Sequence, residues 1–155
     1  MQTLSQHSLM RPIVAVSGGM DPLHIGHLEM IQKARELGRC LVVILNNDNW
    51  LRQKKGYVFM LQNDREQILR ALKYVDEVII TSHKPTQTDM SVCKELRQIH
   101  PDIFAKGGDR TSDNTPEAKL CAELGIKVVY GLGDKIRASS DLVKEAAAVL
   151  THMSR

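Results

Sequence analysis

Short apolar runs alternate along the chain with longer segments whose apolar residues recur at helical spacing. The short runs are nearly continuous in Val, Ile and Leu, as in Leu41-Val42-Val43-Ile44-Leu45, which is typical of strands buried on both faces. These predicted strands cover residues 13–16, 41–45, 78–80, 103–105 and 126–130. The predicted helices cover residues 25–37, 62–74, 90–99, 116–124 and 140–150.

A strand followed each time by a helix predicts a parallel sheet covered on both faces. We therefore expect an α/β fold with a doubly wound, five-stranded parallel sheet, forming a single domain over residues 12–155 after a flexible segment over residues 1–11. In such sheets ligands bind beyond the carboxyl ends of the strands, where the strand order reverses. Polar segments that follow strands are therefore the candidate binding residues. The basic segment over residues 52–56 is expected to be a long loop.

Composition and charge narrow the function classes. The formal net charge of +3 comes from 21 basic and 18 acidic residues, which suits a small polyanion and argues against nucleic acid. Cys40, Cys93 and Cys121 are odd in number and lack C-x-x-C spacing, so we expect a reduced cytoplasmic protein without a zinc site. Neither a signal-peptide pattern nor an apolar run of about 18 residues occurs, and we expect no membrane association.

The segment Gly18-Gly19-Met20-Asp21-Pro22-Leu23-His24-Ile25-Gly26-His27 joins the first predicted strand to the first helix. His24 and His27 are three residues apart at the start of that helix, so their side chains can face one ligand. A helix N-terminus favours phosphate, and imidazoles can donate hydrogen bonds to phosphate oxygens. The glycines allow close approach of backbone and ligand. The alternative is that the histidines are ordinary cap and surface residues.

Other phosphate and metal motifs are absent from the sequence. It contains no G-x-x-x-x-G-K-[ST] segment, and no G-x-G-x-x-G follows the first strand, so neither a P-loop nor a dinucleotide fingerprint is indicated. The two histidines lack H-E-x-x-H spacing and an evident third ligand, which excludes a zinc interpretation. We expect no metal site built from protein residues alone.

Four motifs in order resemble the nucleotidyltransferase superfamily that includes the cytidylyltransferases and pantetheine-phosphate adenylyltransferase. Residues 18–27 look like its H-x-G-H signature, although Met20 stands where the families usually have Phe. Residues 54–56, Arg65 and residues 74–78 are similar to glycerol-3-phosphate cytidylyltransferases. Two later segments complete the likeness, which spans residues 13–146: a turn resembling heptose-1-phosphate adenylyltransferases at 106–109 and a serine-rich signature at 136–145.

The resemblance implies a Rossmann-like nucleotidyltransferase fold and an in-line attack by an acceptor's phosphate on the α-phosphorus of a nucleoside triphosphate. It implies that His24 and His27 stabilise the transition state and that Lys54 or Lys55 closes over the phosphates. Arg65 and Asn47 are the implied acceptor-binding residues. The implied nucleotide-binding residues are Ser17, Gly18, Gly19, Met20, Asp21, Gly26, Lys106, Gly107, Gly108, Asp109, Arg137, Ser139 and Ser140.

Simpler interpretations stand beside these roles. The lysines could lie in a solvated loop, Arg65 could pair with Glu66 or Asp64 on a helix surface, and Ser139 and Ser140 could merely cap a helix. The polar cluster that contains Asn47 could simply end a strand.

The cofactor and partners follow from the resemblance. Mg²⁺ is expected to be held mainly by the nucleotide phosphates, since no carboxylate cluster is visible. The substrates remain open between CTP with glycerol 3-phosphate and ATP with a sugar 1-phosphate, with a pantetheine-phosphate-type adenylyltransferase as a further alternative. A nucleotide-binding module without turnover is the rival from another class. Resemblance to the superfamily also implies a homodimer.

Overall fold

The computed structural model describes residues 10–107, 114–133 and 138–154. Within them, five parallel strands form one sheet in the order β3-β2-β1-β4-β5, which confirms the predicted α/β fold. The strands are β1 (Ile13–Gly18), β2 (Cys40–Leu45), β3 (Glu77–Ile80), β4 (Ile103–Gly107) and β5 (Lys127–Leu132). The helices are α1 (Ile25–Arg35), α2 (Asp48–Lys55), α3 (Gln62–Ala71), α4 (Cys93–Ile99), α5 (Pro116–Leu124) and α6 (Ser139–Met153).

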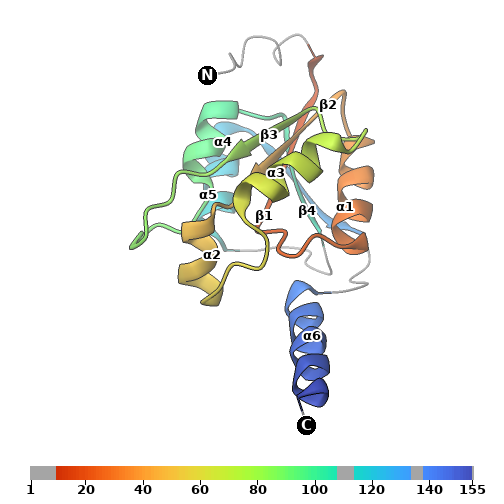
Figure 1. Ribbon diagram of the computed structural model, residues 1–155. Helices are drawn as coiled ribbons and strands as arrows, with labels where there is room; N and C mark the ends of the chain where they lie inside the picture. Colours follow the sequence, from red (N-terminus) through yellow and green to blue (C-terminus); the bar gives the residue numbers. More distant parts are fainter. Residues whose placement is uncertain (1–9, 108–113, 134–137, 155) are drawn as a thin grey trace.

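Helices cover both faces of the sheet because successive strand residues point to opposite sides. In β1, Val14 and Val16 belong to one apolar cluster with Ile31 of α1 and Leu69 of α3. Ile13 and Ala15 belong to the other cluster, with residues of α4 and α5. Figure 1 shows these two pairs of helices on opposite sides of the sheet. Helices therefore cover both faces of the sheet, and the carboxyl ends of its strands remain for binding.

The strand order reverses at β1, which pairs with β2 on one side and with β4 on the other. Such a reversal opens a crevice at the carboxyl ends of the two strands. The segment between β1 and α1, which carries both candidate histidines, begins at this point. The fold thus places the histidine segment where ligands bind in sheets of this class.

The expectation of a long loop over residues 52–56 is wrong, because residues 48–55 form α2. The Asn47 side chain caps the start of α2, and Gly56 ends it with a left-handed φ of 86°, a conformation that glycine adopts without steric cost. The basic residues of its last turn complement the helix dipole. Only Leu51 of α2 is buried, and its only apolar residues, Trp50 and Leu51, are adjacent, so no repeat of apolar residues at helical spacing marked this helix.

The remaining differences lie at the ends of elements. The helix predicted over 62–74 ends at Ala71, and the one predicted over 90–99 begins only at Cys93. The last helix extends to Met153 and projects away from the sheet (Figure 1). Within the described part of the chain, no helix is both long enough and apolar enough to cross a membrane. Most of the flexible segment expected over residues 1–11 lies outside the described residues.

Candidate functional site

The turn after β1 is held from within by a buried carboxylate. Asp21 is 1% exposed and accepts hydrogen bonds from the backbone N–H groups of Phe59 at 2.7 Å and Met60 at 2.6 Å. Met20, beside it, is buried and has a φ of 51°, the left-handed region that non-glycine residues rarely adopt. The contacts of Asp21 therefore join the turn to the segment between α2 and α3.

The two histidines form the N-terminal cap of α1. His24 is the N-cap residue, and its Nδ1 accepts a hydrogen bond from the backbone N–H of Gly26 at 3.0 Å. The backbone N–H of His24 in turn donates to Nδ1 of His27 at 3.2 Å. The two rings stack with their centroids 3.9 Å apart. In this capping box His24 stands at the N-cap position, where Ser or Thr is usual, and His27 stands at the third helical position, where Glu or Gln is usual. The cap therefore fixes both rings.

These hydrogen bonds determine the tautomers of both rings. A neutral imidazole has one acceptor nitrogen and one donor nitrogen, and Nδ1 is the acceptor in His24 and in His27. The proton of each neutral ring therefore lies on Nε2. The pKa of His27 is lowered to about 4, mainly by burial and further by the nearby charges of His24 and Lys55. At neutral pH His27 is consequently an uncharged donor.

Lys55 is distinguished from Lys54 by its electrostatic effect on His27. Both lysines lie in the last turn of α2 and are exposed. Of the two, only Lys55 contributes to lowering the pKa of His27. The fold has therefore brought the positive charge of Lys55 close to the histidine pair across 28 positions of sequence, from 27 to 55.

Arg65 lies beneath the turn and is 0% exposed. Its guanidinium donates to the backbone oxygens of Gly19 at 2.6 Å, Asn46 at 2.7 Å and Met60 at 2.8 Å. It also binds the carboxylate of Asp48 at 2.7 Å. The surface pairing with Glu66 or Asp64 is wrong, because Arg65 is buried against Asp48. Its binding of an acceptor phosphate stays a prediction, and the contacts seen here support the turn.

Asn47 also has contacts at both ends of its side-chain amide. Its Oδ1 accepts from the backbone N–H of Trp50 at 2.9 Å, and its Nδ2 donates to the backbone oxygen of His83 at 2.8 Å. Asn47 thus begins α2 and ties it to the segment after β3. Gly19 provides the space for this helix, since a Cβ at Gly19 would lie 2.8 Å from Leu51. Contact of Asn47 with the acceptor stays a prediction.

The start of α6 reaches the same turn. Ser139 is 7% exposed, and its hydroxyl donates to the backbone oxygen of Pro22 at 3.0 Å. Ala138 is the N-cap residue and makes no side-chain capping bond, so the simpler interpretation that Ser139 or Ser140 merely caps this helix is wrong. Backbone N–H groups at an uncapped helix start favour anions. The contact with Pro22 therefore brings a second phosphate-favouring helix end to the turn after β1.

The predicted residues after β4 are only partly described. The ammonium of Lys106 donates to the Thr115 hydroxyl at 3.3 Å and lies over the Phe104 ring. Gly107 allows β4 to approach α1 closely, because a Cβ there would lie 2.8 Å from the Met30 sulfur. Ser17 and Gly18 end β1, and Gly26 lies in the first turn of α1. Three predicted nucleotide-binding residues lie outside the described residues: Gly108, Asp109 and Arg137.

Two contacts of the site carry no local signal in the sequence. Asp48 pairs with Arg65 from 17 positions away, and Asp21 binds backbone groups 38 and 39 positions along the chain. Among the described residues, no group of three His, Cys, Asp or Glu side chains could hold a metal ion. Asp21 and Asp48 are already bound by protein donors. The site therefore consists of hydrogen-bond donors and cations, which suit phosphate oxygens.

The fold and the site define a Rossmann-like α/β protein with a candidate phosphate site at the turn after β1. A family model described as cytidylyltransferase-like matches residues 15–145. The chain therefore belongs to the cytidylyltransferase-like family, which confirms the resemblance to the nucleotidyltransferases.

Individual relatives agree with the family. The chain is 38% identical over 143 residues to FAD synthase of Thermococcus sibiricus, covering 87% of this chain and 93% of that protein. It is 36% identical over 137 residues to the bifunctional protein HldE of Streptomyces coelicolor. The matched region covers 87% of this chain but only 28% of that relative. A lipopolysaccharide core biosynthesis protein from Thermoplasma volcanium has a similar structure, with a TM-score of 0.64, 28% identity, and coverage of 78% of this chain and 96% of that one.

The lowered pKa of His27 predicts how stability depends on pH. In the unfolded chain His27 binds a proton near pH 6.5, and in the folded protein it does so only near pH 4. The contribution of this difference to the free energy of unfolding is therefore fully present above pH 6.5 and is lost as the pH falls toward 4. The loss is on the order of 2 kcal/mol. Urea unfolding at pH 7 and pH 4.5 should show that His27→Gln removes this part of the decline, whereas the exposed-site control His152→Gln does not. An unchanged decline in His27→Gln contradicts the assignment.

Proposed function

We propose that the chain transfers a nucleoside monophosphate from CTP or ATP to the phosphate of a small acceptor, with release of pyrophosphate. The observation that carries this proposal is the pair of imidazoles at the start of α1, whose Nδ1 atoms are both occupied by backbone donors. The proton of each neutral ring is therefore on Nε2, and the cap fixes the direction of this N–H group. Family membership supports the same class of reaction.

In the proposed reaction, an oxygen of the acceptor's phosphate attacks the α-phosphorus in line, and the bond from that phosphorus to the bridging oxygen of pyrophosphate breaks. Negative charge on the α-phosphate oxygens is then stabilised by the Nε2–H groups of His24 and His27 and by the ammonium of Lys55. The uncapped start of α6 is suited to the departing pyrophosphate. No covalent intermediate with the enzyme is required.

ATP is the nucleotide that we favour, because FAD contains an adenylate and FAD synthases are among the relatives. The acceptor that we propose is a polyol phosphate or a sugar phosphate. Mg²⁺ would enter with the triphosphate as part of the substrate, since the carboxylates of Asp21 and Asp48 are bound by protein donors. Two alternatives are a pantetheine-phosphate-type adenylyltransferase and a module that binds nucleotide without turnover.

Pyrophosphate release across a matrix of triphosphates and phosphorylated acceptors tests the reaction. At least one pair should give turnover, and His27→Ala should lower kcat by at least about 100-fold, because one donor to the developing charge is lost. His152→Ala, an exposed histidine of α6, is the matched control and should keep full turnover. If no pair gives pyrophosphate release, the chain is better explained as a binding module. Near-normal turnover of His27→Ala contradicts a catalytic role of His27.

The neighbouring lysines of α2 give a paired test. Lys55→Ala should lower kcat more than about tenfold, because its charge reaches the histidine pair, whereas Lys54→Ala should change kcat less than about threefold. Both substitutions remove one exposed ammonium from the same helical turn, so a general charge effect would be shared. Equal losses of kcat in the two variants would contradict a specific role of Lys55.

We also propose a homodimer. Support comes from α6, whose apolar residues Val149, Leu150 and Met153 are between 57% and 76% exposed, and burial of such side chains favours association. Light scattering should give twice the mass of the chain, and Leu150→Glu should reduce it toward one chain. A mass of one chain in the unsubstituted protein contradicts this proposal.

A further inference from the structure

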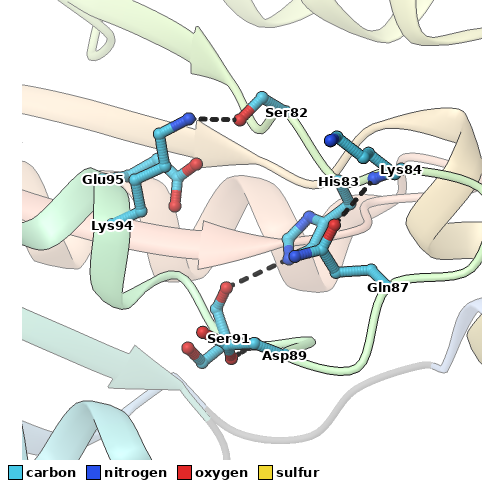
Figure 2. Close-up of a pocket in the computed structure, with 8 residues that line it drawn as sticks. All are labelled: Ser82, His83, Lys84, Gln87, Asp89, Ser91, Lys94 and Glu95. Atoms are coloured by element: carbon cyan, nitrogen blue, oxygen red, sulfur yellow. Dashed lines mark hydrogen bonds between the residues drawn. The ribbon is translucent and has the colours of Figure 1, made fainter.

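A polar pocket of about 190 Å³ lies beyond the carboxyl end of β3, between the segment that follows this strand and the start of α4. All of the residues that line it have polar side chains, and they include Ser82, His83, Lys84 and Glu95 (Figure 2). None of the residues named so far as phosphate-binding lines this pocket. No sequence motif indicated this pocket.

Glu95 has an unmet hydrogen-bonding requirement in this pocket. Its side chain is 4% exposed, and its Oε2 is buried without a hydrogen-bond partner. Figure 2 shows the carboxylate in the wall of the pocket, between Ser82 and Ser91 and across from the His83 ring. A buried carboxylate oxygen without a donor is costly, so a ligand that supplies a donor is favoured there.

The walls of the pocket are fixed before any ligand binds. The His83 ring lies between the Thr81 hydroxyl at 2.8 Å and the Ser91 backbone oxygen at 3.0 Å. Its backbone oxygen accepts from the side chains of Asn47 and Asn49 at 2.8 Å and 2.9 Å. Because Asn47 begins α2 and Lys55 ends it, the same helix connects the pocket to the histidine pair.

The chemistry of the lining favours a ligand with several hydroxyl groups. The charges of Lys84 and Lys94 balance those of Asp89 and Glu95, so the pocket does not select for a charged group. Lys94 donates to the Ser82 hydroxyl at 2.8 Å, which leaves that hydroxyl free to donate to a ligand. Hydroxyl groups can both accept from such donors and donate to Glu95.

We propose that this pocket binds the hydroxyl-bearing part of the acceptor, with one hydroxyl donating to the carboxylate of Glu95 while the acceptor's phosphate lies at His24 and His27. This inference rests on the proposed nucleotidyl transfer. Strands β1 and β3 are separated by β2 alone, so the segments that follow them begin about 10 Å apart along the sheet edge. A hexose or heptose phosphate spans that distance better than glycerol 3-phosphate, which favours a sugar phosphate as the acceptor.

Calorimetric binding of glucose 1-phosphate, mannose 1-phosphate, glycerol 3-phosphate and ATP to the full chain tests this pocket without requiring turnover. At least one sugar phosphate should bind the unsubstituted protein more tightly than glycerol 3-phosphate. Glu95→Gln should weaken sugar phosphate binding about tenfold, since a hydrogen bond to a charged group is lost, and should leave ATP binding unchanged. Glu123→Gln, at an exposed position of α5, is the matched control.

Failure to bind either sugar phosphate, or equal binding by Glu95→Gln and the unsubstituted protein, overturns the assignment. The melting temperature of the ligand-free protein is a second readout. Glu95→Gln should leave it unchanged or raise it, because a buried unpaired charge is removed, and a fall would show that Glu95 has a structural role instead. Glu95-dependent sugar phosphate binding without pyrophosphate release under any condition would support the pocket and contradict the proposed transfer.

Discussion

A single buried guanidinium connects the segments that build the site. Arg65 binds the backbone oxygens of Gly19 after β1 and Asn46 after β2, and it pairs with Asp48 at the start of α2. Arg65 is 0% exposed and the Asp48 side chain 15% exposed, so removal of the guanidinium would leave largely buried oxygens and a carboxylate without these donors. The relative positions of the histidine turn and α2 therefore depend on one residue of α3.

The electrostatics of the site follow from this arrangement. Burial is the main cause of the lowered pKa of His27, and His24 and then Lys55, which α2 brings close to the turn, lower it further. A neutral His27 is a hydrogen-bond donor through Nε2 without carrying a positive charge of its own. In the proposed reaction, the attraction for phosphate comes from Lys55 and from the start of α1, and the imidazoles supply directed hydrogen bonds.

The fold could be predicted from the sequence because its strands are buried on both faces. Residues such as those of β2 are uniformly apolar, and each strand is followed by a helix or by polar residues at the same sheet edge. The histidine segment could also be predicted, because its glycines and histidines lie close together in the sequence. By contrast, α2 has one buried residue and no repeat of apolar residues, and its sequence signals are the residues at its two ends, Asn47 and Gly56.

Contacts between distant residues could not be predicted in this way. The sequence around Arg65 contains nearer carboxylates at Asp64 and Glu66, but the fold turns the side chain inward toward Asp48. The effect of Lys55 on His27 and the unpartnered oxygen of Glu95 likewise exist only once the elements pack. Local pattern identified the chemical groups, and tertiary structure determined their partners.

The proposed transfer depends on fixed Nε2–H donors that His24 and His27 present to a nucleotide's phosphates. Nitrogen NMR of the two imidazoles at pH 7, without and with the magnesium complex of ATP, measures this directly. Both rings should carry the proton on Nε2 in the free protein, and both Nε2 signals should shift when the nucleotide binds. A proton on Nδ1 of either ring, or nucleotide binding that leaves both Nε2 signals unchanged, would contradict this role of the two histidines.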